Sequence, residues 1–139
     1  MTRYLGIDFG ERRVGIAISD DEGRLSVPFD TLERASDRQI VGVIRQLADE
    51  EGIGGLVVGE PRTLDGEAGD AAKRVRSFAA KLEEGTGIQV RFIDEALTTV
   101  EAESRLREAG VPRRRMAKKR DALAAQILLQ EWLDQEASR

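Results

Sequence analysis

Hydrophobic and polar residues alternate from about residue 3 to residue 32 of the chain, which is the pattern of half-buried β-strands. Two turn segments, "FGERR" and "DDEG", interrupt this alternation, so three strands are expected to follow one another without a helix between them. Pro28 lies in the third strand segment, "RLSVPFDTL", and indicates an edge strand or a bulge because proline has no N–H for a central ladder. The chain therefore begins with a predicted antiparallel meander.

Helical spacing of the apolar residues begins after this meander and then alternates with short apolar strands. A helix is predicted over residues 36–52, with Ser36 as its N-cap and Gly52 as its C-terminal stop. The same reasoning predicts strands over 54–61 and 88–94 and helices over 67–85, 98–110 and 121–135. This order predicts one α/β domain over residues 1–139, with a mixed five-stranded sheet, its first three strands antiparallel, flanked by helices.

Composition limits the chemistry that is available to this domain. Of the 139 residues, 40% are hydrophobic, which is enough for one core, and none is cysteine or histidine. Disulfides, thiolate metal sites and a serine–histidine triad are therefore excluded, and carboxylates, lysine, hydroxyls or a metal remain. No apolar run has the length of a membrane span, and no signal-peptide pattern is present, so a cytoplasmic protein is expected.

Asp8 interrupts the first apolar strand, between Gly6 and Gly10. Burying an unpaired carboxylate is costly, and the two glycines leave room for a metal or a substrate backbone to approach. The alternative is an aspartate at the end of the strand that faces solvent. Asp8 is the first candidate for a functional carboxylate.

Further acidic residues occur where they are unfavourable for stability alone. Asp94 and Glu95 end an apolar strand, and because adjacent strand residues point to opposite sides, one of the two is expected to face Asp8. Glu95 is preferred for its longer side chain, although both acids also suit the N-terminal dipole of the next helix. Asp121 lies on a helical stripe with Ala125, Leu128 and Trp132, so it is expected to point along the buried seam near the helix start, with a dipole role as the alternative.

These carboxylates, if the sheet brings them together, repel one another unless cations lie among them. Mg²⁺ and Mn²⁺ prefer such oxygen ligands, and one or two ions of this kind activate water for attack on a phosphodiester. A protein without histidine has this route to phosphodiester hydrolysis.

Basic residues gather next to the candidate site in a chain whose net charge is −4. The run "RRRMAKKR" directly precedes Asp121 and contributes Arg113, Arg114, Arg115, Lys118, Lys119 and Arg120. Arg12 and Arg13 occupy the first turn, and Arg62 lies in the glycine-rich stretch "GEPRTLDGEAG". Phosphate contacts are the functional interpretation, and a solvated face or a simple connector is the alternative. With 4% aromatic residues, backbone recognition is favoured over base stacking.

Four blocks of the chain resemble the signature blocks of the YqgF (RuvX-like) family: "LGIDFGERRVGIAISD", "LVVGEPRTLDGEAG", "DEALTTVEAE" and "RDALAAQILLQEWLD". Members of that family are described as Holliday-junction resolvases and as nucleases of pre-16S rRNA. The resemblance implies a ribonuclease H-like fold, a cytoplasmic protein and a role in maturing the 5′ end of 16S rRNA. Carried over by motif, the acidic positions of the family fall on Asp8, the Asp94–Glu95 pair and Asp121. The resemblance implies that Asp8, Glu95 and Asp121 are catalytic and that all four acids are candidate metal ligands.

One block departs from the family pattern, which usually has Gly-Leu-Pro where this chain has Gly59-Glu60-Pro61. Glu60 is either a supplementary ligand or an exposed substitution, and the second interpretation is favoured. The predicted function is a Mg²⁺- or Mn²⁺-dependent endonuclease that acts on structured RNA of the pre-ribosome, as a monomer or weak dimer. The alternatives are a DNA junction resolvase, a non-catalytic ribosome-assembly factor, and a nucleotide-binding hairpin like that of actin-like ATPases, which need a second domain.

Overall fold

The computed structural model describes residues 1–61, 69–95 and 98–139. The elements occur in the predicted order, three strands followed by helices that alternate with strands. Their bounds are β1 Tyr4–Phe9, β2 Arg13–Ser19, β3 Ser26–Glu33, α1 Asp37–Glu51, β4 Gly55–Pro61, α2 Asp70–Thr86, β5 Val90–Glu95, α3 Thr98–Glu108 and α4 Arg113–Ala137.

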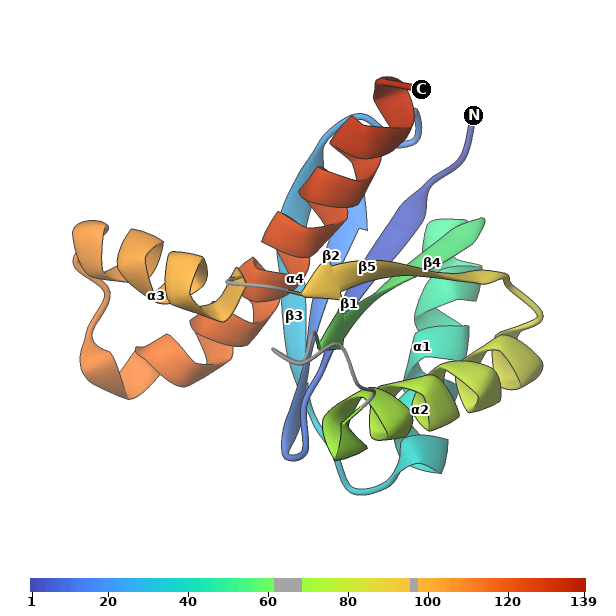
Figure 1. The fold of residues 1–139 in the computed structure, drawn as a ribbon, viewed down its shortest axis with the longest axis horizontal. Helices are drawn as coiled ribbons and strands as arrows, with labels where there is room; N and C mark the ends of the chain where they lie inside the picture. The colour runs from blue at the N-terminus through green and yellow to red at the C-terminus, as the bar shows by residue number, and fades with distance from the viewer. Residues whose placement is uncertain (62–68, 96–97) are drawn as a thin grey trace.

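The five strands form one mixed sheet in the order β3-β2-β1-β4-β5 (Figure 1). β1 pairs antiparallel with β2 and parallel with β4, and β5 is parallel to β4. β3 is an edge strand, and its pairing with β2 shifts register between Ile16 and Ala17, opposite the segment that contains Pro28. The edge position and the bulge indicated by Pro28 are both confirmed. The first strand of the chain thus becomes the central strand of the sheet.

Helices cover both faces of the sheet (Figure 1). On one face, Leu5 and Ile7 of β1 belong to a core cluster with Ile44 of α1 and Phe78 of α2. On the other face, residues of the sheet pack against α4. This second cluster consists of Ala17, Val57, Ile93, Ala125, Leu128, Leu129, Trp132 and Leu133. The inner strands are therefore buried on both sides, which explains why β4 is almost wholly apolar.

The ends of α1 follow the predicted capping residues. The Ser36 side chain accepts a hydrogen bond from the N–H of Gln39 over 3.1 Å, and this satisfies one of the free donors at the helix start. Gly52 ends the helix in the left-handed region, at a φ of 64°. Among the described residues, no helix is both long and apolar enough to cross a membrane.

The last helix is longer than the predicted range of 121–135. α4 begins at Arg113, directly after Pro112, so the basic run forms its first two turns. Arginine and lysine are good helix formers, and proline is well tolerated at a helix start, so nothing local stops the helix before residue 121. Asp121 therefore lies inside α4, not near its start, and the expected terminal position is wrong. With α3, the first half of α4 forms an antiparallel arm (Figure 1).

Candidate active site

Strand alternation decides which acidic side chains share a face of the sheet. On β5, Ile93 packs into the α4-side cluster, so Glu95 faces α4, while Asp94 faces the other side and is exposed. On β1, Ile7 packs beneath α1 and α2, so Asp8 faces α4 as well. The structure therefore places Asp8 and Glu95 on one face and turns Asp94 away from it.

The side chains of Asp8 and Glu95 lie within hydrogen-bonding reach of each other. Burial is the main cause that raises the pKa of the Asp8 carboxyl, and the negative charge of Asp121 raises it further. The hydrogen bond with Glu95 and the positive charge of Arg120 oppose these effects without cancelling them. A raised pKa among crowded carboxyl groups is typical of functional sites.

Two glycines let the remaining elements approach this pair closely. Gly15 of β2 lies opposite Asp8, and a Cβ on Gly15 would be 1.9 Å from the backbone oxygen of Asp121. A Cβ on Gly59 of β4 would be 3.1 Å from Oε2 of Glu95. The absent side chains leave the space in which α4 rests on β2 and Glu95 lies over β4. All three acidic residues are thereby brought to one region of the α4-side face.

Arginines hold the carboxylate of Asp121. Nε of Arg13 donates to its Oδ2 over 2.6 Å, and Nε of Arg120 lies 3.6 Å from its Oδ1. Arg120 is itself held by Oε1 of Glu103 on α3, at 3.0 Å. Sequence reasoning assigned Arg13 to nucleic-acid binding and missed this pair, because the partners are 108 residues apart. No local pattern signals a contact over that separation.

The carboxylates of Asp8, Glu95 and Asp121 are suitable ligands for a hard divalent cation, although they are not arranged as a complete coordination site. Within the described ranges, no group of three acidic side chains is arranged to hold a metal ion. Asp8 and Glu95 nevertheless present carboxyl oxygens in contact, and Asp121 is near enough to act on the charge of Asp8. Oxygen donors that crowd together in this way suit Mg²⁺ or Mn²⁺. Asp121 does not complete such a group with them, and Arg13 occupies its Oδ2.

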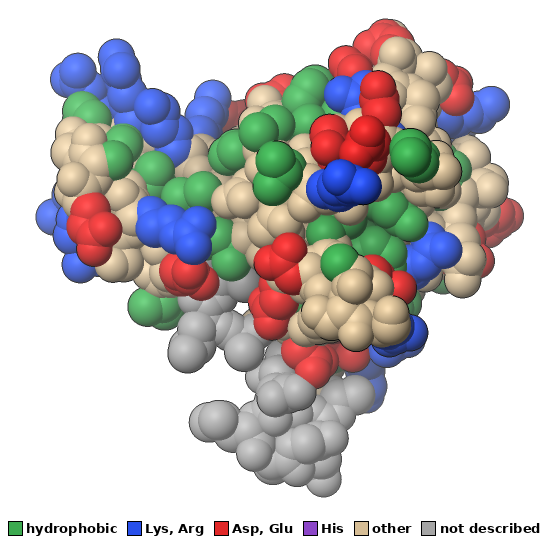
Figure 2. Space-filling model, turned by 90° about the horizontal axis from the view of Figure 1, so that it is seen from above, with side chains coloured by type: hydrophobic (Ala, Val, Ile, Leu, Met, Phe, Trp, Pro, Cys, Tyr) green, Lys and Arg blue, Asp and Glu red, His purple; other side chains and the backbone are tan. Residues whose placement is uncertain are grey.

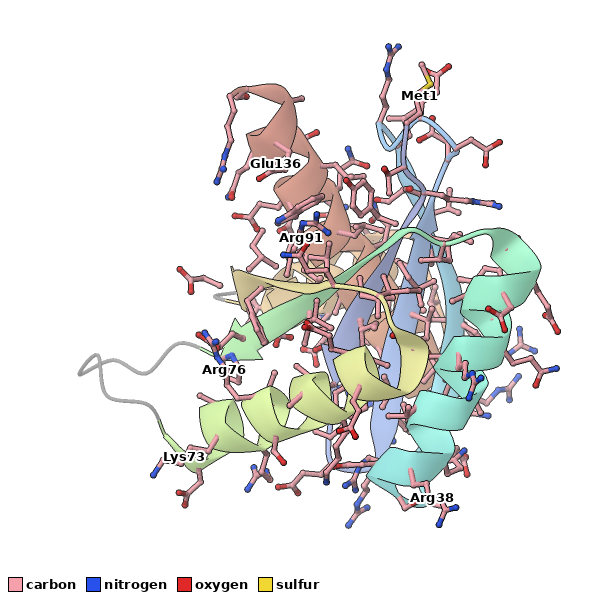
Figure 3. The ribbon with its side chains drawn as sticks, turned by 90° about the vertical axis from the view of Figure 1, so that its right-hand side faces the viewer. Met1, Arg38, Lys73, Arg76, Arg91 and Glu136 are labelled. Atoms are coloured by element: carbon pink, nitrogen blue, oxygen red, sulfur yellow. The ribbon has the colours of Figure 1, made fainter. Side chains whose placement is uncertain are left out.

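Glu60 lies on the opposite face of the sheet from this site. On β4 it alternates with Gly59, and its carboxylate forms an ion pair with Arg76 of α2. The Arg76 guanidinium, labelled in Figure 3, also lies 4.0 Å from the ring centroid of Phe92. Glu60 is thus part of a partly exposed surface cluster. The structure favours the surface-substitution interpretation over a supplementary ligand.

The predicted phosphate-contacting residues lie mostly on exposed surface. Arg113–Arg115, Lys118 and Lys119 are exposed on α4, and Arg120 is half-buried beside Asp121. Figure 2 shows Lys and Arg side chains gathered at the end of the molecule that carries the α3–α4 arm. Arg12 is exposed in the turn between β1 and β2. Arg62 lies outside the described residues.

Solved structures with the same arrangement of elements define the class of fold. The chain is similar to RuvC of Thermus thermophilus in complex with a Holliday junction substrate, with a TM-score of 0.62, 15% sequence identity, and coverage of 99% of this chain and 97% of that one. It is also similar to the large terminase nuclease of the thermophilic phage G20c, with a TM-score of 0.54, 13% identity, and coverage of 94% and 81%. The protein therefore has a RuvC-like, ribonuclease H-like fold, as expected.

Sequence comparison narrows this class to a family. Residues 2–135 match the model of the RuvX family, which is described as a Holliday junction resolvase. A protein of Anaeromyxobacter sp. (strain Fw109-5) is 41% identical over 95% of this chain and 96% of its own length, and one of Maridesulfovibrio salexigens is 37% identical over 94% and 97%. Both carry the name "Putative pre-16S rRNA nuclease". The chain belongs to the RuvX family.

Proposed function

We propose that this protein is a metal-dependent endonuclease that hydrolyses phosphodiester bonds in the 5′ region of pre-16S rRNA. The observation that carries the proposal is the direct contact of Asp8 with Glu95, with Asp121 beside them on the same face of the sheet. The names of the relatives and the RuvC-like fold support the same reaction class. A cytoplasmic location follows from such a substrate.

In this proposal, Asp8 and Glu95 are the first ligands of Mg²⁺ or Mn²⁺, and Asp121 is the third. When bound, such a cation supplies an activated water and stabilises charge on the leaving oxygen. The half-buried position of Asp8 limits the water around its carboxyl, which strengthens electrostatic attraction at that point. Asp94 has no part in the reaction, because it faces away from Asp8.

The substrate backbone is proposed to lie along exposed basic residues near the site. The exposed basic residues on the first two turns of α4 directly precede Asp121 in the helix. Arg12, Arg38 and Lys73 are also exposed, and they form no ion pair within the described part of the chain. Figure 3 shows Arg38 and Lys73 at one end of the molecule, where α1 and α2 begin. Such side chains neutralise phosphates without reading base sequence.

A four-way DNA junction is the second candidate substrate, because the family is described as a Holliday junction resolvase. The carboxylate chemistry would be the same for DNA and RNA. Symmetric cutting of a junction needs two active sites, so this function requires a dimer. A stable monomer in solution argues for RNA.

The experiment that tests the proposal is cleavage of a labelled RNA that carries the 5′ precursor region of 16S rRNA. The purified protein is assayed with Mg²⁺, Mn²⁺ or EDTA, beside a labelled four-way DNA junction. Asp8→Asn removes the central carboxylate, and Asp21→Asn is the matched control because that side chain is 91% exposed. We expect metal-dependent cleavage that Asp8→Asn abolishes and Asp21→Asn retains.

Cleavage by the Asp8→Asn protein at the wild-type rate would refute the assigned site. RNA that is bound and not cut with either metal would refute the nuclease and favour a non-catalytic assembly factor. Preferential cutting of the DNA junction would replace the RNA substrate with the second candidate.

A further inference from the structure

Arg13 makes the shortest contact to Asp121 that the structure describes. Its Nε lies 2.6 Å from Oδ2, and the side chains of Arg13 and Asp121 are 30% and 16% exposed. An ion pair that is shielded to this extent is less screened by water and salt than a surface pair. The contact therefore sets the position of the Asp121 carboxylate.

The surrounding backbone keeps the two side chains together. Arg13 and Gly15 lie on the same face of β2, and Gly15 is the point where α4 rests on the strand. One turn earlier on α4, the carbonyl of Lys118 accepts a hydrogen bond from the Thr31 hydroxyl of β3. The helix is thus attached to two strands next to the ion pair.

Arg13 and a bound metal cation would compete for the same carboxylate. Asp8, Glu95 and Asp121 are drawn to positive charge, and Arg13 occupies Oδ2 of Asp121. A divalent ion at Asp8 and Glu95 adds two positive charges on the face of the sheet to which Arg13 also points. It attracts Asp121 and repels Arg13, so the two cations compete for one carboxylate.

We propose that Arg13 is an internal counter-ion, a positioning residue that holds Asp121 away from the Asp8–Glu95 pair until a divalent cation displaces it. This inference rests on the proposed function, in which Asp121 is a metal ligand. Displacement leaves the Arg13 guanidinium beside the site with its charge free for a phosphate of the substrate. In this proposal, Arg13 pairs with the Asp121 carboxylate before the metal binds and with a phosphate of the nucleic acid afterwards.

The test is a calorimetric titration of the full chain with Mn²⁺ in the absence of nucleic acid. Arg13→Gln removes the competitor, and Arg12→Gln removes the same charge from the neighbouring exposed residue. We expect Arg13→Gln to bind Mn²⁺ on the order of fivefold more tightly, the worth of the lost ion pair, and Arg12→Gln to stay within about twofold of wild type. Arg13→Met, which keeps the length of the side chain without its charge, replaces Arg13→Gln where circular dichroism shows that the first variant does not fold.

Tighter binding is the sign that distinguishes competition from support. If Arg13 only supported the site, its removal would loosen Asp121 and weaken Mn²⁺ binding. Weaker binding or an unchanged affinity would therefore overturn the inference, while the proposed function would stand. In an Asp121→Asn background, Arg13→Gln is expected to add no tightening, because the shared carboxylate is gone. Tightening that persists in that background also overturns the inference. A folded wild-type protein that binds no Mn²⁺ would overturn both it and the proposed function.

Discussion

Gly15 marks a very close approach between α4 and the sheet, and its replacement by alanine tests the geometry on which the site depends. A Cβ at this position would lie 1.9 Å from the carbonyl oxygen of Asp121 and 2.4 Å from its carbonyl carbon. Both atoms belong to helix backbone, so a side-chain rotation cannot relieve the clash. Since ordinary contact begins near 3.4 Å, α4 must move outward by about 1.5 Å at this point.

The energetic cost follows from what α4 covers. Ala125, Leu128 and Leu129 are fully buried against the sheet, and lifting the helix loosens their packing. Overpacking typically costs about 1–3 kcal/mol, and the upper end applies where backbone must move. We expect Gly15→Ala to lower the free energy of unfolding by about 3 kcal/mol, which corresponds to a decrease in Tm of roughly 10 °C for a chain of this length.

Urea and thermal unfolding of the purified variant measure this loss, with Gly42→Ala as the matched control. Gly42 lies in α1, and no heavy atom lies within 4 Å of a Cβ added there, so alanine should stabilise the protein by about 0.5–1 kcal/mol through helix propensity. RNA cleavage by Gly15→Ala should fall as well, because Asp121 moves with α4. A Gly15→Ala protein within about 0.5 kcal/mol of wild type would show that α4 does not lie on β2 as described.

Three further predictions follow from the site and its surroundings. Glu95→Gln should reduce RNA cleavage roughly 100-fold, while Asp94→Asn, on the opposite face, should stay near the wild-type rate; equal losses would refute the assigned faces. Burial raises the pKa of Asp37, but hydrogen bonds from Arg34 and a lysine of α2 outweigh it and lower the pKa. Its stabilising effect is therefore complete above the ordinary aspartate range and lost as the pH falls through the lowered pKa. Asp37→Asn should lower Tm at pH 7, and its gap to wild type should begin to narrow below about pH 4 and close only below the lowered pKa; a gap in Tm that is constant with pH would contradict this. Replacing the exposed arginines at 113–115 with glutamine should weaken RNA binding and reduce the logarithmic salt slope by about two to three, and an unchanged slope would exclude them from phosphate contact.

The local sequence pattern predicted the strands and helices correctly, except for the start of α4. The order of strands and helices, the caps of α1 and the edge position of Pro28 depend on residues close together in sequence, where periodicity and backbone chemistry act directly. The start of α4 was misplaced because a run of arginine and lysine is compatible with both a solvated loop and a helix. What decides between them is the contact of this segment with α3, where Arg120 forms an ion pair with Glu103.

The candidate site divides in the same way. Sequence alone named Asp8, Glu95 and Asp121, because burying a carboxylate within an apolar segment lowers stability and therefore indicates a function. It left Asp94 open, since two neighbours on a strand are equivalent until the faces of the sheet are known. The structure separated them through Ile93, which packs on the α4 side and so fixes where Glu95 points.

The sequence by itself determined the class of this protein: one α/β domain, without cysteine or histidine, whose chemistry depends on carboxylates. Only the tertiary structure decided how those carboxylates are held. Three contacts join residues that are distant along the chain: Asp8 with Glu95, the α4 backbone with Gly15, and Arg13 with Asp121. Such contacts have no local signature, because they arise when sheet pairing and helix packing bring separate segments to one face.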